Sequence, residues 1–385
     1  MSNGYPMVPL GEIARPVERP EIPITGKVYR QIGVRLWGDG AYEREPIDGS
    51  QTRYSTLSRV EQNDIIVNKI WARNGSVAIV TQALAGCYGS GEFPTFAPNL
   101  LRLEPRWFHW LTKTKNFWEQ CDEKSRGTSG KNRIKPEKFL HVVIPLPPLE
   151  EQRRIVARIE ELASRIEEAR RLRRETELAC DNLCRSMIFA ESREQVTMTS
   201  MEYLVTLREA DVAVHQDETY HFAGVYCFGK GVFAGQRKSG MEFAYNRLTR
   251  LKTNNFVYPK LMAWEGALGV VPAECDGLVV SPEFPVFEVH KERVLPEFLD
   301  VYFRTPSVWP TLSAASTGTN VRRKRLNPAD FLRLMVPLPS MQRQRELRDI
   351  KIKADSIKKL QGETRAELEA LLPSVLDRAF RGELV

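Results

Sequence analysis

The sequence predicts an α+β protein with a pseudo-two-fold internal repeat, in which two mixed α/β globular domains are joined by two long helices that form an antiparallel coiled coil. Two observations predict this fold class. A proline-rich junction occurs twice, as IPLPPLEEQRRI at 144–155 and as VPLPSMQRQREL at 336–347, and each copy leads into a highly charged segment. Much of the remaining chain also matches itself after a shift of 191 residues, which takes Gly33 onto Gly224.

The repeat divides the chain into four consecutive segments. The predicted boundaries are 1–148 for the first globular domain, 149–195 for the first helix, 196–339 for the second globular domain and 340–385 for the second helix. Within the globular domains, short apolar runs such as DIIVNKI and GLVVSPEFPVFEV alternate with Gly, Pro and Asn, which is typical of strands separated by turns. A helical stretch is expected in each domain, around 106–121 and 296–313.

Each proline-rich junction predicts the start of a long helix, because proline is accepted in the first turn and prevents extension toward the N-terminus. After each junction apolar residues recur every three or four positions between charged flanks, which favours a coiled coil. The alternative is that each helix lies on its own globular domain. The expected apolar stripes are Ile155, Ile159, Leu162, Ile166, Ala169, Leu172, Thr176, Ala179, Leu183 and Met187 in the first helix, and Leu347, Ile350, Ala354, Ile357, Leu360, Thr364, Leu368, Leu371 and Val375 in the second.

The order of the segments predicts how the two helices pair. One helix lies in the middle of the chain and the other at its end, so the second globular domain must travel back to present the second helix. We therefore expect an antiparallel pair. A helix of about 35 residues is roughly 50 Å long, which suits a spacer between two globular domains.

Composition and charge restrict the class of protein. The formal charge is +7, and its excess lies outside the predicted helices, since 149–195 holds ten Arg against eleven Asp and Glu, and 340–385 holds ten Lys and Arg against eight Asp and Glu. This permits a polyanionic partner. No apolar run approaches the ~20 residues of a membrane span, and the N-terminus lacks a signal-peptide pattern, so we expect a cytoplasmic protein without a membrane partner. The six cysteines include no CxxC pair, which argues against a metal site.

The sequence contains no recognised catalytic motif. It has no P-loop, no H-E-x-x-H and no G-x-S-x-G. Its five histidines have no matched partners across the repeat, although a catalytic residue in a duplicated unit is expected to occur twice. The Gly-x-Gly pairs in WGDG at 37–40 and FGKG at 228–231 favour tight turns over a nucleotide-binding loop. We therefore expect a protein that is not an enzyme.

Two matched loops carry most of the candidate DNA contacts. SRGTSGKNRIKPEKF at 125–139 and STGTNVRRKRLNPADF at 316–331 each place Gly-Thr before a run of cations. Small residues let the backbone approach a phosphate, and Arg and Asn can pair with the edges of guanine and adenine. The alternative is a solvated surface loop. The candidate residues are Arg126, Thr128, Lys131, Asn132 and Arg133 in the first loop, and Thr317, Thr319, Asn320, Arg322, Arg323, Lys324 and Arg325 in the second.

A second matched region is NKIWARNGS at 68–76 against PKLMAWEGA at 259–267. The lysine recurs, whereas the tryptophan changes position, and core packing is the alternative role for the tryptophans. Two domains that share a frame but differ at polar positions could read different DNA sequences. The candidate DNA-binding residues here are Lys69, Trp71, Arg73, Lys260 and Trp264.

Several of these passages resemble type I restriction–modification DNA specificity subunits. The resemblance rests on both PLP junctions, the opening VPLGEIARPVER, the passage STGTNVRRKRLNPADFLRLMVPLPSMQRQ and the closing LLPSVLDRAFRGELV. It implies two target-recognition domains that read the halves of a bipartite, asymmetric DNA site, with the coiled coil setting the gap between them. In such a phage-defence system the specificity subunit itself carries no active site.

The resemblance also implies partners and cofactors. The partners are double-stranded DNA, two methyltransferase subunits that methylate adenine, and two restriction–translocase subunits. No cofactor is expected on this chain, because S-adenosylmethionine, ATP and Mg²⁺ belong to the partner subunits. Two other classes stay open: a structural adaptor whose coiled coil assembles protein partners without reading DNA, and a nuclease with an unrecognised motif.

Overall fold

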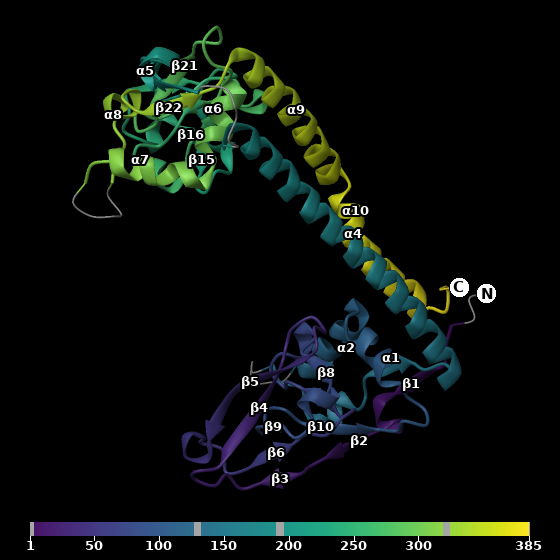
Figure 1. Ribbon diagram of the computed structural model, residues 1–385. Helices are drawn as coiled ribbons and strands as arrows, with labels where there is room; N and C mark the ends of the chain where they lie inside the picture. The colour runs from purple at the N-terminus through teal and green to yellow at the C-terminus, as the bar shows by residue number, and fades with distance from the viewer. Residues whose placement is uncertain (1–3, 127–131, 190–195, 319–323, 385) are drawn as a thin grey trace. The chain divides into compact units, whose positions relative to one another are not determined.

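Each globular domain shares a unit of the structure with parts of the long helical segments (Figure 1). The computed structural model describes residues 4–126, 132–189, 196–318 and 324–384. Unit 1 comprises Met1–Arg171 and Thr364–Val385, and unit 2 comprises Leu172–Glu363. The units divide the chain inside the helical segments and not at their ends, so the boundaries predicted at 148, 195 and 339 stay predictions.

Unit 1 contains two main sheets. The four-stranded sheet has the order β2–β10–β7–β8, and the five-stranded sheet has the order β3–β6–β9–β4–β5, in which β4 pairs with β9 in parallel through Gln31 and Tyr88. β1 pairs with β11 alone. The strands are β1 Met7–Pro9, β2 Ala14–Val17, β3 Pro20–Glu21, β4 Val28–Val34, β5 Ala41–Asp48, β6 Leu57–Arg59, β7 Ile65–Val67, β8 Val77–Ile79, β9 Tyr88–Gly89, β10 Thr95–Pro98 and β11 Val143–Pro145.

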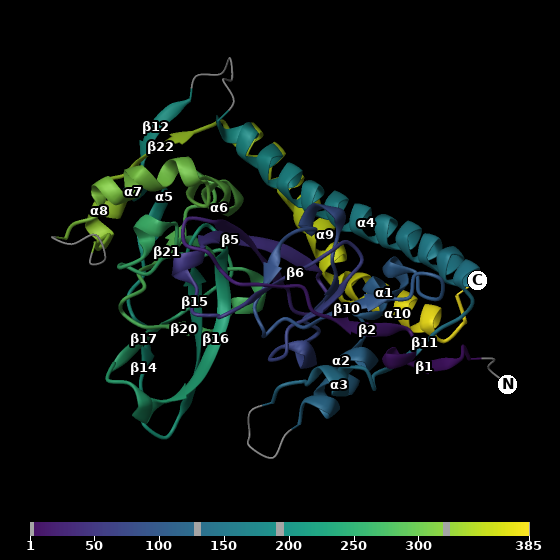
Figure 2. The ribbon, with the colours of Figure 1, turned by 90° about the horizontal axis from the view of Figure 1, so that it is seen from below.

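Unit 2 repeats this arrangement strand for strand. The strands β14, β15, β16, β17 and β20 of its five-stranded sheet are labelled in Figure 2. Its sheets have the orders β13–β21–β18–β19 and β14–β17–β20–β15–β16, and β12 pairs with β22. The parallel contact recurs between Phe222 and Val279, each 191 residues after its counterpart, which confirms the predicted internal repeat. The strands are β12 Thr197–Ser200, β13 Val205–Leu207, β14 Val212–Ala213, β15 Thr219–Tyr226, β16 Gly231–Ser239, β17 Arg247–Arg250, β18 Phe256–Val257, β19 Gly269–Val270, β20 Val279–Val280, β21 Val286–Val289 and β22 Met335–Leu338.

The helices of the two units also correspond. Each helical stretch expected near 106–121 and 296–313 is divided in two, because Thr114 in unit 1 and Thr305 in unit 2 adopt extended backbone. Unit 1 contains α1 Pro105–Leu111, α2 Lys115–Ser125 and α3 Pro136–Phe139, and unit 2 contains α5 Met201–Leu204, α6 Pro296–Phe303, α7 Trp309–Ala315 and α8 Pro328–Leu332. The long helical segments are α4 Leu149–Phe189, α9 Met341–Glu363 and α10 Arg365–Phe380.

Aromatic packing ties the C-terminal helix to unit 1. Trp107 on α1 is fully buried, its ring centroid lies 4.7 Å from that of Phe380 on α10, and its Nε1 donates to the Pro145 carbonyl at 3.0 Å. A buried tryptophan removes on the order of 200 Å² from water, so this contact anchors α10 strongly. Ile155 and Ile159 of α4 belong to the same core.

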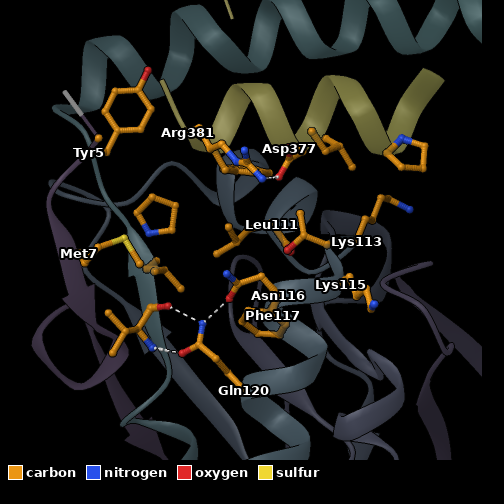
Figure 3. A pocket seen from close by; sticks show the side chains of 18 of the residues that line it. Tyr5, Met7, Leu111, Lys113, Lys115, Asn116, Phe117, Gln120, Asp377 and Arg381 are labelled. Carbon is orange, nitrogen blue, oxygen red and sulfur yellow. Dashed lines mark hydrogen bonds and ion pairs between the residues drawn. The ribbon is translucent and has the colours of Figure 1, made fainter. Parts of the chain in front are cut away.

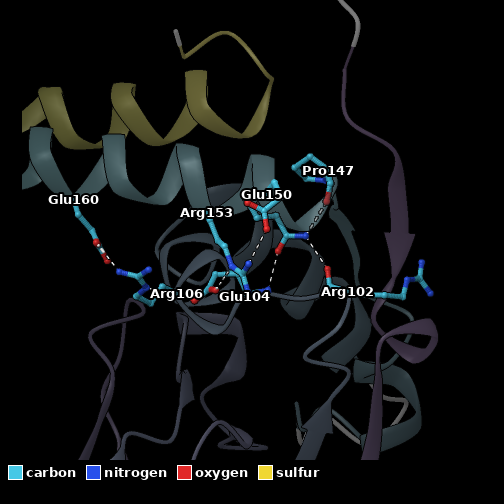
Figure 4. A network of polar contacts seen from close by, with 8 residues as sticks. Arg102, Glu104, Arg106, Pro147, Glu150, Arg153 and Glu160 are labelled. Carbon is cyan, nitrogen blue, oxygen red and sulfur yellow. Dashed lines mark hydrogen bonds and ion pairs between the residues drawn. The ribbon is translucent and has the colours of Figure 1, made fainter.

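A buried glutamine makes equivalent contacts in each proline-rich junction. Gln152 is fully buried; its Nε2 donates to the carbonyls of Arg102 and Pro147, both at 2.8 Å, and its Oε1 accepts from the Glu104 amide at 2.9 Å (Figure 4). Gln344 does the same in unit 2, donating to Pro339 at 3.0 Å and accepting from Leu295 at 2.8 Å. The junction therefore fixes the start of a long helix to the segment that follows β10 or β21.

Surface ion pairs surround the first of these glutamines. Arg153 lies between Glu150 at 2.7 Å and Glu104 at 3.5 Å, and Arg106 reaches Glu160 of α4 at 3.1 Å (Figure 4). All of these pairs are at least partly exposed, so each contributes about 0–1 kcal/mol. The buried glutamine, with three satisfied hydrogen bonds, dominates the joint.

The two long helical segments run antiparallel where they meet in unit 2. Lys358 on α9 bonds Asp181 on α4 at 2.5 Å, and Arg173 donates to the Gln361 carbonyl at 3.3 Å. Increasing numbers on one helix thus face decreasing numbers on the other, as predicted.

The predicted apolar stripe is wrong in the second half of α4. Leu172 and Leu183 are 49% and 51% exposed, and Ala179 is exposed as well, whereas Cys184 is buried. A straight helix has 3.6 residues per turn, so a stripe followed at 3.5 drifts by ~20° in each heptad. Along α9 and α10 the predicted Ile357, Leu360 and Leu371 are likewise exposed.

The second predicted helix is not continuous. α9 ends at Glu363, and Thr364 leaves helical geometry with φ −97° and ψ 8° before α10 begins. Gly362 and Thr364 are both weak helix formers, which favours a break at this position. The division between the two units falls at the same place.

Candidate nucleic-acid interface

The structure describes eleven of the seventeen predicted DNA-binding residues. Thr128, Lys131, Thr319, Asn320, Arg322 and Arg323 lie outside the described residues. The remaining residues occur in two matched settings, one in each unit, so the site is built twice.

In unit 1 the backbone of Lys69 joins the two predicted regions. Its amide donates to the Glu92 carbonyl at 3.0 Å, and its own carbonyl accepts from the Ile134 amide at 2.9 Å. The Arg133 guanidinium lies 3.0 Å from the Glu92 carboxylate. Lys69, Glu92 and the end of the cationic loop therefore form one anchor.

Unit 2 builds the same anchor from the matched residues. The Lys260 amide donates to Glu283 at 3.0 Å, its carbonyl accepts from Leu326 at 2.9 Å, and Arg325 pairs with Glu283 at 2.5 Å. The 68–76 and 259–267 segments, which the sequence offered as separate candidates, thus lie beside the ends of the cationic loops. We name these two arrangements the loop anchors.

The charged ends of the anchor residues have protein partners. The Lys260 ammonium donates to the Pro282 carbonyl at 2.9 Å, and Arg133 and Arg325 are held by Glu92 and Glu283. Arg133 and Arg325 are half exposed, and such pairs contribute only about 0–1 kcal/mol. A phosphate or a guanine edge can therefore compete for these arginines.

The second cationic loop is closed at its base. Thr317 and Arg325 exchange both backbone hydrogen bonds, at 2.9 and 2.8 Å, and Lys324 donates to the Ser313 hydroxyl at 2.9 Å. In unit 1 Arg126 pairs with Asp122 of α2 at 3.1 Å, and Asn132 is half-buried. Both loops are thereby attached to the helix that precedes them.

Trp71 and Arg73 lie beside an open groove of about 730 Å³ in unit 1. Trp71 is 45% exposed, and the Arg73 guanidinium lies 6.0 Å from the centre of its ring. The groove combines tryptophans with cations and carboxylates: Trp37, Trp71, Trp118, Arg73, Lys115, Arg126, Glu119, Asp122 and Glu123. In unit 2 Trp264 is half-buried, with its Nε1 donating to the Leu261 carbonyl at 2.9 Å, so the two units present different surfaces here.

Several residues at this interface were not identified from the sequence. Trp37 lies in the groove, and its signal was the aromatic residue that precedes Gly-x-Gly in both repeats. Arg44, Arg53 and Tyr54 line a second groove of about 620 Å³ that also contains Trp71. The repeat could not reveal Arg44 and Arg53, because the matched positions hold Gly235 and Ala244.

A cavity of about 670 Å³ in unit 1 contains none of the predicted residues (Figure 3). It lies between α2, the β1–β11 ribbon and α10, with Tyr5, Leu111 and Phe117 on its wall. Gln120 spans one side by donating to the Val143 carbonyl and accepting from the Val143 amide, both at 2.9 Å. Its chemistry is mixed and apolar, unlike that of the loop anchors.

Neither a metal cluster nor a membrane span occurs in the described part of the chain. No group of three or more His, Cys, Asp and Glu side chains there could hold a metal ion. None of the helices in the same residues is long and apolar enough to cross a membrane.

Solved structures share the fold along almost the whole chain. The HsdS subunit from Thermoanaerobacter tengcongensis matches with a TM-score of 0.59 at 22% identity, covering 100% of this chain and 98% of its own. A chain from a study of complex assembly and conformational transition of the type I R-M system matches with a TM-score of 0.68 at 20% identity, covering 99% of both chains. The S subunit from M. genitalium gives 0.51 at 11%, covering 99% of this chain and 97% of its own. The fold is thus that of type I S subunits.

The sequence comparisons identify the family of the first half. Residues 7–175 match the family described as Type I restriction modification DNA specificity domain. The type I restriction enzyme EcoBI specificity subunit of Escherichia coli is 34% identical over 109 residues, which are 27% of this chain and 21% of that relative. The match therefore spans about a fifth of that relative's length. The match of residues 7–175 to this family confirms the resemblance predicted from the sequence.

Proposed function

We propose that the chain is the non-catalytic DNA-specificity subunit of a type I restriction–modification complex. Unit 1 and unit 2 each read one half of a bipartite, asymmetric site in double-stranded DNA. The specificity domain at 7–175 and the repeated fold support this proposal. A chromosomal DNA target would place the protein in the cytoplasm.

One observation carries the proposal: the loop anchor is built twice, with different side chains around it. Lys69 and Lys260 hold the loops through identical backbone hydrogen bonds. The positions next to them differ, since Trp71 corresponds to Met262 and Arg73 to Trp264. Two domains with the same backbone arrangement but different contact residues can read two different half-sites.

Base contacts come from the two cationic loops and from the segments that carry Lys69 and Lys260. Other Lys and Arg residues hold phosphates and set the register of the protein on the duplex. Arg73, beside Trp71 in the groove, can reach a base edge, where a bidentate contact to guanine discriminates by about 1–3 kcal/mol. The remaining candidates in the loops include Arg322 and Arg323, and replacing either by Ala should relax the preference at one half-site if it contacts a base, or weaken all binding and flatten the salt dependence if it contacts a phosphate.

The long helices set the distance between half-sites. α4 has 41 residues, which corresponds to roughly 60 Å, and it continues from unit 1 into unit 2. Its pairing with the C-terminal helical segment makes that spacer stiffer than a single helix.

The partners follow from the proposed role. Two methyltransferase subunits transfer a methyl group from S-adenosylmethionine to adenine, and two restriction–translocase subunits use ATP and Mg²⁺. These cofactors bind the partners, and this chain supplies the sequence specificity.

Methylation mapping tests the proposal. The chain is co-expressed with the methyltransferase subunit from its own source, and the host DNA is sequenced for methyladenine. We expect a split motif of two short specific halves around a fixed gap. Replacing Arg73 by Ala should relax one half only, whereas the exposed control Arg106→Ala should leave the motif unchanged. New methylation without a split motif, or no new methylation from a stable complex, contradicts the proposal.

The cavity under α10 supports a second candidate, a structural adaptor. Its apolar wall, formed by residues such as Tyr5 and Phe117, could accept a protein partner without any contact to DNA. A titration of duplex DNA with nonspecific competitor separates the two functions. An adaptor shows no sequence preference and little dependence on salt, whereas a specificity subunit shows both.

A further inference from the structure

Each unit presents one exposed aromatic ring on a tight turn. Trp37 lies between β4 and β5, and Phe228 lies at the matched position between β15 and β16. Their side chains are 52% and 65% exposed. Large aromatic rings gain free energy by leaving water, so two matched exposed rings indicate a binding surface.

Both residues hold a backbone conformation that is unusual for a bulky side chain. The φ angles of Trp37 and Phe228 are 60° and 61°, in the left-handed region that glycine favours. Such residues are strained, and they persist where the surrounding structure imposes them. A glycine here would relieve this strain, yet both repeats carry an aromatic residue.

The turn is held in place from two sides. The Trp37 amide donates to Asn74 at 2.7 Å, and Gly38 donates to Gly75 at 2.9 Å. Phe228 and Gly229 make the same bonds to Glu265 and Gly266, at 2.8 and 3.0 Å. These acceptors lie in the short 3-10 turns Ala72–Asn74 and Ala263–Glu265 that follow the loop-anchor lysines, or directly after them.

A tryptophan packs against each exposed ring. The centroid of Trp37 lies 5.1 Å from that of Trp118, and Phe228 lies 6.3 Å from Trp309. Trp118 and Trp309 are themselves fixed, because their Nε1 atoms donate to the Thr112 and Phe303 carbonyls at 2.6 and 3.1 Å. The exposed ring is thus a rigid platform.

The charges that line the groove beside Trp37 balance. Its carboxylates are Glu119, Asp122 and Glu123 and its cations are Arg73, Lys115 and Arg126, and Glu119 pairs with Lys115 while Asp122 pairs with Arg126. Carboxylates in such a groove can accept hydrogen bonds from the amino groups of cytosine or adenine. The cationic loop starts at the edge of the same groove with Arg126, so bound DNA would bring its phosphates there and its bases toward Trp37.

We propose that Trp37 and Phe228 are base-stacking residues, each of which lies against a nucleobase that is unstacked in the bound DNA. This inference rests on the proposed function, because it requires DNA at the loop anchors. Stacking on an aromatic ring is tolerant of sequence, and it holds an opened base step in place. The aromatic turn would then supply the deformation, while the neighbouring loops and grooves supply sequence readout.

Ring removal in the full-length chain tests the proposal. The variants are Trp37→Gly and Phe228→Gly, which remove the ring and suit the positive φ, with Trp37→Asn as a second ringless variant. Trp37→Phe and Phe228→Trp keep a ring, and Leu36→Ala is a control in the same turn. Each protein is first checked by its unfolding midpoint, then used to select sequences from a pool of random duplexes.

We expect the ringless variants to bind the selected duplex about 5- to 150-fold more weakly, the range that the loss of one base–aromatic stack produces. The slope of log affinity against log salt should not change, since no cation is lost. With 2-aminopurine placed through the half-site, the wild type and Trp37→Phe should change the fluorescence at one position, because the base there exchanges its neighbours for the aromatic ring, and Trp37→Gly should not give the same change.

Other outcomes distinguish a failure of the stacking role from a failure of the proposed function. Selection of a sequence by the wild type with normal binding by the ringless variants overturns the stacking role and leaves the proposed function intact. The stacking role is also overturned if those variants lose only complex formation with the methyltransferase, which would make the rings a protein contact. If the wild type selects no sequence, the proposed function fails, and this inference fails with it.

Discussion

Gln152 and Gln344 have the same structural role in the two proline-rich junctions. Each places one amide side chain in a buried setting where it satisfies backbone groups from separate segments. The second junction lacks the Glu pair of the first, yet it keeps the glutamine three positions into the helix start. The amide is therefore the structural requirement of the motif, and the charges around it are variable.

Replacement of either glutamine should destabilise its unit. Gln152→Leu leaves the Glu104 amide and two carbonyls without partners, and Gln344→Leu does so for the Leu295 amide and the Pro339 carbonyl. Unsatisfied buried groups cost about 1–3 kcal/mol each, so we expect a loss of about 2 kcal/mol or more. Urea unfolding measures it. Arg153→Ala removes only exposed ion pairs and should change stability by less than about 1 kcal/mol; equal losses for Gln152→Leu and Arg153→Ala would contradict this role.

Two glycines should respond oppositely to a methyl group. Gly362 lies in the exposed last turns of α9 with open space around it, so Gly362→Ala should stabilise the helix by about 1 kcal/mol. Gly75 has φ 71°, and a Cβ there would lie 2.5 Å from Trp118 Nε1, so Gly75→Ala should destabilise unit 1. Thermal unfolding compares the two variants with the wild type. A stabilising Gly75→Ala would show that the turn carrying Trp37 is not held as described.

At the scale of elements, one helix position carries different charges in the two units. Asp300 on α6 is buried and lies 3.0 Å from Arg304 and 3.3 Å from Lys351 of α9. The matched positions in unit 1 hold His109 on α1 and Ile159 on α4. Burial and the nearby Lys113 lower the pKa of His109 to about 4, so it is neutral at pH 7. The contact between α9 and α6 in unit 2 therefore contains the ion pair of Lys351 and Asp300. The matched contact between α4 and α1 in unit 1 contains the uncharged Ile159 and His109.

This difference specifies which long helix covers which globular domain. If α9 took the place of α4, Lys351 would lie beside the neutral His109, and its acidic partner would be the exposed Asp355 of its own helix in place of the buried Asp300. A buried charge that loses a buried partner is destabilised, which disfavours the exchanged pairing. The ion pair therefore contributes more to the choice of partner than to net stability.

The Asp300 contact predicts a pH dependence confined to unit 2. Burial raises the pKa of Asp300, but Arg304 and Lys351 outweigh it, and the net pKa is below the usual 3.8. A lowered pKa means that the stabilisation is complete above about pH 4 and disappears as pH falls through the folded-state pKa. Asp300→Asn should cost about 3 kcal/mol at pH 7, and the deficit relative to the wild type should shrink below about pH 4.

Hydrogen exchange of the α6 and α9 amides measures this effect without mixing it with the unfolding of unit 1. The control is Asp355→Asn, which removes an exposed partner of Lys351 at 2.8 Å and should cost less than about 1 kcal/mol. A deficit for Asp300→Asn that is independent of pH would show that its charge is not responsible.

At the scale of the whole molecule, the two globular domains have the same architecture, and we expect them to act as interchangeable modules. Strand order and the parallel register are the same in both domains. Each domain contacts the start of its long helix through a matched glutamine, Gln152 or Gln344. Sequence preference should therefore move with a module. The chain positions of the two modules set only the order of the half-sites.

A domain replacement checks this modularity. A chain in which 196–339 is replaced by a copy of 4–147, with both long helical segments retained, would place the copied His109 against Lys351 of α9, so the copy carries His109→Asp to restore a carboxylate there. This chain should fold and should direct methylation to a split motif whose halves are inverted copies of one another. The measurement is the same methyladenine sequencing. Its control is the reciprocal replacement, which should give the inverted repeat of the other half. Retention of the original asymmetric motif would mean that recognition does not reside in the modules.

The sequence by itself determined the repeat, the fold class, the antiparallel order of the long helices and the segments that form the loop anchors. It could do so because duplication preserves spacing, so that matched residues such as Lys69 and Lys260 reveal a shared frame without any knowledge of contacts. The DNA-contact roles of all seventeen candidate residues stay predictions, and six of those residues lie outside the described structure.

Only the tertiary structure decided which faces are buried and which residues meet. Helical spacing alone favoured Leu172 and Leu183, but the packing buries Cys184, because the phase of a straight helix is set by what it contacts. The exposure of Trp37 likewise depends on segments far apart in the chain, since its turn is held by Asn74 and its ring packs on Trp118. Local spacing records the duplication, whereas the environment of each side chain is a property of the folded units.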